Sequence, residues 1–201
     1  ISPYLAGWIY ALGIAWDAVT DPFMGYLAER TSSPRGRYRP YILFGTIPLA
    51  LSFVLLFWVP PLEGLSLFLC LVVINVFHRT CFTIVSVPYS SLTPRITSDS
   101  EERTNLTTAR MIGASFGTLL MSSLGFPIIN FFGQNDESLG IIYLSFISAS
   151  IAVVILYFTY WSVKESSTEE IKETYPSVSK LISSILILNK NIIVNRFDYG
   201  Y

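Results

Sequence analysis

Two aspartates, Asp17 and Asp21, lie inside an otherwise apolar segment and are the residues of this sequence best placed to bind a charged ligand. Their spacing of four residues puts both carboxylates on one face of a helix, together with Tyr10 and Gly13. If that helix crosses a membrane, each carboxylate near its centre costs about 2.5–3.5 kcal/mol. Two of them on one face therefore indicate a hydrated cavity that binds a cation, a proton or a polar solute. A structural ion pair within a helix bundle is the alternative.

A second polar stripe lies further along the chain. Its members fall at spacings of 4, 7 and 11 residues from the first, which is one helical face: Arg79, Thr83, Ser86 and Ser90. A buried guanidinium needs a carboxylate, so Asp17 or Asp21 is the expected partner of Arg79. Arg79 could then act either as a structural partner or as part of a gate or binding site. We expect the neighbouring His78 to make an interhelical hydrogen bond.

The composition places these residues in a membrane. Of the 201 residues, 52% are hydrophobic and 13% are charged, whereas soluble domains carry roughly 25% charged residues. The net charge of -1 and the lack of a basic tract argue against binding to nucleic acid. The sequence has one histidine and no recognisable catalytic constellation, so we expect neither an enzyme nor a cofactor.

Five segments are long and apolar enough to cross a membrane as helices, because a span needs about 20 apolar residues. They cover approximately residues 4–28, 41–59, 65–87, 110–132 and 139–163. Among the loops between and after the spans, only those after the first, third and fifth spans contain lysine or arginine. The positive-inside rule then puts the N-terminus outside and makes residues 164–201 a cytoplasmic linker with an amphipathic segment. Five spans and the missing initiator methionine predict a fragment of a longer chain, which we expect to be monomeric.

Further charged residues lie near the cytoplasmic ends of these spans. Glu29, Arg30 and Arg37 could form a cytoplasmic gate by ion pairing, or the arginines could simply set the topology. Arg110 opens the fourth predicted span. It could reach the interface as a snorkelling side chain or donate hydrogen bonds to a solute in the cavity.

Small residues predict where the helices pack. Gly7, Ala11 and Ala15 lie opposite the aspartate face, and Gly113 and Gly117 form a GxxxG motif. Both patterns are typical of close contacts between membrane helices.

Two stretches resemble a known family. The stretch WDAVTDPFMGYLAERTSSPRGRYRP (16–40) resembles the second helix and following loop of the glycoside–pentoside–hexuronide:cation symporters, within the major facilitator superfamily. The stretch VPYSSLTPRITSDSEERTNLTTARM (87–111) resembles their fourth helix, middle loop and fifth helix. The resemblance implies a protein of twelve helices, of which this chain holds helices two to six. It also implies sugar transport by alternating access across the bacterial inner (plasma) membrane, driven by Na⁺, Li⁺ or H⁺.

The resemblance also assigns roles to residues. Asp17 and Asp21 match the aspartates that bind the coupling cation, which is a metal site if the ion is Na⁺, and Arg110 matches a sugar-contacting arginine. Ser86 and Ser90 stand where melibiose-transporting members have an aspartate and a tryptophan near the sugar. Thr83 could add a ligand for the cation or the sugar, and Tyr10 lies near the same cavity.

Arg79 occupies a position that is usually small in this family, so its positive charge could pair with Asp17 and change or abolish Na⁺ dependence. Two alternatives stay open. One is a lysophospholipid:sodium symporter, a related branch with a similar aspartate helix, which Ser86 favours. The other is a membrane fragment that transports nothing.

Overall fold

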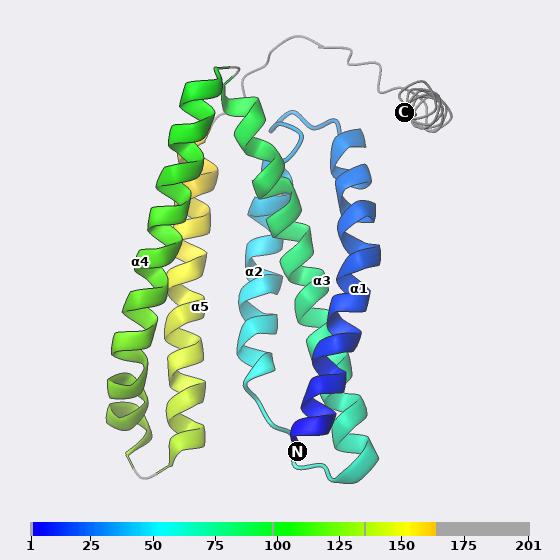
Figure 1. The fold of residues 1–201 in the computed structure, drawn as a ribbon, viewed down its shortest axis with the longest axis vertical. Helices are drawn as coiled ribbons and strands as arrows, with labels where there is room; N and C mark the ends of the chain where they lie inside the picture. The colour runs from blue at the N-terminus through cyan, green and yellow to red at the C-terminus, as the bar shows by residue number, and fades with distance from the viewer. Residues whose placement is uncertain (1, 98, 135, 164–201) are drawn as a thin grey trace, which may run out of the picture. The chain divides into compact units, whose positions relative to one another are not determined.

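The structure is a computed structural model that describes residues 2–97, 99–134 and 136–163. Five α-helices account for the regular structure of these residues (Figure 1): α1 (Pro3–Arg30), α2 (Arg39–Leu56), α3 (Gly64–Ile96), α4 (Ser100–Gly133) and α5 (Glu137–Ser162). The predicted all-α architecture is therefore present. The predicted cytoplasmic segment 164–201 lies outside the described residues.

Polar side chains at the N-cap positions begin three of these helices. The Ser2 hydroxyl accepts a hydrogen bond from the amide of Leu5 at 3.4 Å, directly before Pro3 at the first helical position. Asp99 accepts from the amide of Glu101 at 3.0 Å, and Asp136 accepts from the amide of Ser138 at 2.9 Å. Such caps satisfy amide donors that the helix itself cannot, so they define where α1, α4 and α5 begin.

Two helices extend well beyond the membrane spans predicted from the sequence. α3 runs to Ile96, and α4 begins at Ser100 rather than near Arg110. Arg110 therefore lies within α4 and does not open it. With 33 and 34 residues, these helices are about 50 Å long, so their polar ends extend beyond a hydrocarbon core of about 30 Å.

Within the described residues, four helices are long and apolar enough to cross a membrane: α2, α3, α4 and α5. α1 is not among them, although it has 28 residues. Its apolar run is interrupted by Asp17 and Asp21. We therefore keep the crossing of α1 as a prediction.

The helices pack in a spatial order that differs from their order in the chain. α1 lies against α3, α3 against α2, α2 against α5, and α5 against α4 (Figure 1). α3 touches α4 only lightly. Since α3 contacts both α1 and α2, it is the helix that positions the aspartate face of α1.

The main buried cluster lies where α1 and α3 end and α2 begins. It consists of Met24, Ala28, Tyr38, Ile42 and Leu92. At the same end, the guanidinium of Arg39 donates a hydrogen bond to the carbonyl oxygen of Tyr160 at 2.7 Å and lies 4.6 Å from the centroid of that ring. Contacts among α1, α2, α3 and α5 therefore stabilise this end of the bundle.

The small-residue patterns mark different contacts from those predicted. Gly7, Ala11 and Ala15 are exposed, and a Cβ atom at Gly7, Gly113 or Gly117 would meet no atom within 4 Å. Among the described residues these faces therefore have no close neighbour, and their packing stays a prediction. The close approaches occur at other glycines. A Cβ at Gly45 would lie 2.6 Å from Cγ2 of Val85, and one at Gly133 would lie 3.1 Å from the backbone of Gly140.

Candidate functional site

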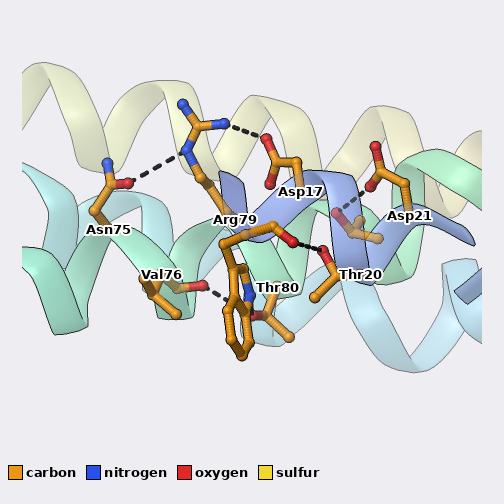
Figure 2. A network of polar contacts seen from close by, with 9 residues as sticks. Asp17, Thr20, Asp21, Asn75, Val76, Arg79 and Thr80 are labelled. Carbon is orange, nitrogen blue, oxygen red and sulfur yellow. Dashed lines mark hydrogen bonds and ion pairs between the residues drawn. The ribbon is translucent and has the colours of Figure 1, made fainter. Parts of the chain in front are cut away.

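The aspartate face of α1 lies against the polar stripe of α3. Arg79 forms an ion pair with Asp17, and the hydroxyl of Thr83 donates a hydrogen bond to Oδ1 of Asp21 at 2.8 Å. Figure 2 shows Asp17 and Asp21 one turn apart on α1, with Arg79 reaching Asp17 from α3. The two faces predicted from the sequence thus meet, and Arg79 has the carboxylate partner expected for it.

Several groups fix the guanidinium of Arg79 in place. Its Nε donates to Oδ1 of Asn75 at 3.2 Å, and its guanidinium carbon lies 5.4 Å from the ring centroid of Tyr10. Gly13 lies directly beneath the guanidinium. A Cβ atom at Gly13 would collide with both Arg79 and Asn75. The ion pair is partly accessible, with side-chain exposures of 19% for Arg79 and 28% for Asp17.

A tryptophan joins the same two helices beside this pair. The indole nitrogen of Trp16 donates to the Thr80 hydroxyl at 2.9 Å. That hydroxyl donates to the carbonyl of Val76 at 2.8 Å (Figure 2). The sequence analysis did not identify this bond. The signal was available, because Trp16 precedes Asp17 and Thr80 follows Arg79, so a register that pairs the charged residues also brings these two together.

The predicted solute residues form a second group. Nη2 of Arg110 donates to the Ser90 hydroxyl at 3.4 Å, and its guanidinium carbon lies 4.7 Å from the ring centroid of Tyr89. Ser86 is half-buried one turn closer to Thr83 on the same stripe. The stripe therefore runs from the aspartates to Arg110 on α4, while Tyr10 lies at the Arg79 end.

The structure does not gather the predicted gating residues into one cluster. Glu29 and Arg30 are exposed at the end of α1, where the guanidinium of Arg30 lies 4.2 Å from the ring of Tyr26. Arg37 belongs to the connection between α1 and α2. Arg79 is paired with Asp17, which is 13 residues or about 20 Å along α1 from Arg30. The gating roles of Arg79 and of the Glu29, Arg30 and Arg37 loop therefore stay separate predictions.

The single histidine lies away from the aspartates. Nδ1 of His78 shares a hydrogen bond with the Ser52 hydroxyl at 3.1 Å, which confirms the predicted interhelical bond between α3 and α2. His78 also borders a cavity of about 260 Å³ whose lining is mostly apolar and includes Phe53, Phe82 and Leu156. This cavity between α2, α3 and α5 offers few polar partners to a sugar or an ion.

Oxygen atoms dominate the donor set at the aspartate face: two carboxylates and the Thr83 hydroxyl. Within residues 2–97, 99–134 and 136–163 there is no cluster of three or more His, Cys, Asp or Glu side chains that could hold a metal ion. Oxygen ligands of this kind suit a hard cation rather than a soft transition metal.

Several curated proteins are similar to this chain. The chain is 31% identical over 172 residues to the "Putative glycoside/cation symporter YagG" of Escherichia coli. It is 29% identical over 184 residues to the isoprimeverose transporter of Lactiplantibacillus pentosus. It is also 39% identical over 132 residues to the sodium-dependent lysophosphatidylcholine symporter 1-A of Danio rerio.

These alignments cover most of this chain but only part of each relative. They include 86%, 90% and 64% of this chain, and 37%, 38% and 24% of the respective relatives. The chain thus spans less than half the length of these relatives. The sequence model of the family described as MFS/sugar transport protein matches residues 1–194. The chain therefore belongs to the MFS/sugar transport protein family.

Proposed function

We propose that this chain is part of a secondary active transporter that carries a sugar, of the glycoside, pentoside or hexuronide class, together with a cation by alternating access. The observation that carries the proposal is the pair of carboxylates on α1 facing the polar stripe of α3. Carboxylates in an apolar helix are costly unless they serve an ion or solute pathway. The relatives named as a glycoside/cation symporter and an isoprimeverose transporter support a sugar as the solute.

The coupling ion, which is Na⁺, Li⁺ or H⁺, would bind at Asp17 and Asp21 with help from Thr83. The sugar would contact Arg110, Ser90, Ser86 and Tyr10. Ring stacking and hydrogen bonding by these side chains suit a hydroxylated solute. The ion drives transport by linkage, because an ion that favours the sugar-binding state raises the affinity for sugar by the same factor. No cofactor or catalytic step is required, so the protein would not be an enzyme.

The proposed setting is the inner (plasma) membrane of a bacterium, with the protein acting as a monomer. The N-terminus of this chain would be outside and the segment 164–201 in the cytoplasm, because the basic loops fall on one side. Glu29, Arg30 and Arg37 would then face the cytoplasm, where they could pair in one transport state.

Uptake into membrane vesicles tests the proposal. Vesicles containing the complete protein would be given radiolabelled pentosides, galactosides and glucuronides, with and without an imposed Na⁺ or H⁺ gradient. We expect one sugar class to accumulate only with a gradient, and Asp21→Asn to abolish the accumulation. Accumulation that is equal with and without every gradient would contradict ion coupling.

A lysophospholipid is the second candidate solute. It is favoured by the 39% identity to the lysophosphatidylcholine symporter of Danio rerio, and by Ser86 at a position where melibiose-transporting members have an aspartate. Adding a labelled lysophosphatidylcholine to the same panel decides between the two. Gradient-driven uptake of the lipid alone would assign the lipid. Uptake of no solute by correctly inserted protein would favour a non-transporting membrane protein.

A further inference from the structure

We infer that Arg79 is a resident counterion of Asp17, so that the coupling ion is held by Asp21 and Thr83 rather than by both aspartates. This inference rests on the proposed function and refines its ion site. It makes Arg79 the residue that sets the ion requirement of the transporter.

The guanidinium of Arg79 is held in place by partners on two helices. It contacts Asp17 through an ion pair, Asn75 through a hydrogen bond at 3.2 Å, and the face of the Tyr10 ring at 5.4 Å. The absence of a side chain at Gly13 provides the space that Arg79 and Asn75 occupy. A guanidinium with partners on two helices behaves as a fixed charge of the site rather than as a side chain sampling solvent.

The charges on the aspartate face do not cancel. Asp17, Asp21 and Arg79 together carry two negative charges and one positive charge, so the face has a net charge of -1. One monovalent cation neutralises it. Without Arg79 the same face would carry a charge of -2 and would attract Na⁺ much more strongly, because unit charges a few ångströms apart interact strongly in a partly buried site.

The two carboxylates differ in the charge of their partners. Asp17 has a charged partner, whereas the contact of Asp21 is with the neutral hydroxyl of Thr83 at 2.8 Å. A hydroxyl can donate to the carboxylate in the absence of an ion and can offer its lone pairs to an ion that arrives. Asp21 is also exposed. An incoming cation would therefore meet Asp21 and Thr83 without displacing a resident charge.

Calorimetric titration of Na⁺ into the purified complete protein tests the inference without any solute. Choline chloride would keep the ionic strength constant. We expect Arg79→Gln to bind Na⁺ at least about tenfold more tightly than the wild type, because Asp17 becomes available. Arg79→Lys, which keeps the charge, should bind Na⁺ as the wild type does. An Arg79→Gln protein with wild-type or weaker Na⁺ affinity would overturn the inference.

A second variant decides the matter if Arg79→Gln does not fold. In the double variant Asp17→Asn/Arg79→Gln, the ion pair is replaced by a neutral amide pair, and the face keeps a net charge of -1 from Asp21. We expect its Na⁺ affinity to match the wild type within about threefold. If Asp17 is instead a direct ion ligand, the double variant should lose at least about tenfold in affinity.

The sugar panel and the calorimetry can fail separately. If no sugar is transported but the Na⁺ pattern is as expected, the proposed solute is wrong and the role of Arg79 stands. If sugar uptake is ion-driven but Arg79→Gln gains no Na⁺ affinity, the transport function stands and Arg79 is only a structural partner.

Discussion

Asp17 and Asp21 share one helical face but differ in what holds them. Asp17 is compensated by the full charge of Arg79, whereas Asp21 contacts the neutral hydroxyl of Thr83. A hydrogen bond to a charged group contributes about 1.5–3 kcal/mol, and a carboxylate with a guanidinium partner gains a charge–charge interaction in addition. Each aspartate therefore depends on a single side chain of α3, a charged one for Asp17 and a neutral one for Asp21.

Thr83→Val tests the role of this hydroxyl. Valine has the same shape but cannot donate to Asp21 or offer oxygen to an ion. We expect the ion concentration needed for half-maximal sugar uptake to rise about tenfold or more, which corresponds to the loss of one charge-assisted hydrogen bond. Thr83→Ser keeps the hydroxyl and should stay within about threefold of the wild type. Equal ion dependence in the valine and serine variants would remove Thr83 from the ion site.

Trp16 offers a second prediction at the scale of residues. Trp16→Phe removes the bond to Thr80, but the Thr80 hydroxyl keeps its bond to the carbonyl of Val76. Since no buried group is left unpaired, we expect a loss of only about 0.5–1.5 kcal/mol in stability, seen as a lower thermal unfolding midpoint in detergent. Trp8→Phe is the control on the same helix, because Trp8 is half exposed and contacts the ring of Tyr4. Identical midpoints for the two variants would show that the Trp16 bond contributes nothing.

The sequence predicted which elements exist better than where they end. Hydrophobic segments mark the part of a helix that lies in lipid, so all five helices were found. They do not mark the helical turns beyond the membrane. The predicted spans 65–87 and 110–132 are therefore shorter than the helices α3 and α4. In α4 the cap at Asp99, followed by acidic residues in the first turn, was the available signal for an earlier start.

The sequence pattern did not predict which neighbour each small-residue face has. Spacing of small residues identifies faces that can approach a neighbour closely, but it does not say which neighbour is present. Gly7 and Gly113 face open space, whereas Gly140 lies against the backbone of Ile129. The polar faces were predicted more successfully, since a buried arginine needs a carboxylate and Asp17 was within reach. The need of a buried arginine for a carboxylate identifies one partner, whereas a small residue can pack against many different neighbours.

The contact between α4 and α5 leads to a prediction about glycine. A Cβ at Gly140 would collide with the carbonyl oxygen of Ile129 and lie 2.8 Å from its Cγ2 atom. Gly140→Ala should therefore force the two helices apart and cost about 1–3 kcal/mol. The measurement is the thermal unfolding midpoint of the purified protein.

Gly125→Ala is the matched control on the same helix pair. A Cβ there would lie 3.8 Å from Cδ2 of Leu144, which is ordinary contact. Since alanine favours helix over glycine by about 1 kcal/mol, this variant should be neutral or slightly stabilising. A Gly140→Ala protein as stable as Gly125→Ala would show that α4 and α5 are less closely packed than described.

At the scale of the whole molecule, the exposed surface fits a lipid environment. Large apolar side chains are exposed along α4, among them Met111, Ile112, Phe116 and Leu119. A soluble protein rarely exposes so continuous an apolar surface. In a bilayer these side chains have no such penalty, since lipid tails are as apolar as they are. The long helices and this surface together indicate a multi-pass membrane protein.

The proposed orientation of the bundle in that membrane rests on the charge of its connecting segments. The connection after α1 contains Arg35 and Arg37, while the connection between α2 and α3 contains no lysine or arginine. In a cysteine-free background, Glu63→Cys should react with a membrane-impermeant maleimide in intact cells, because the proposed orientation puts it on the outer side. Ser32→Cys, exposed after α1, should react only once the cells are permeabilised. Reaction of both cysteines in intact cells would mean that α2 does not cross the membrane. The reverse pattern would invert the topology, and would place Asp21 nearer the outside than Asp17, so that ions would enter the site from the opposite direction.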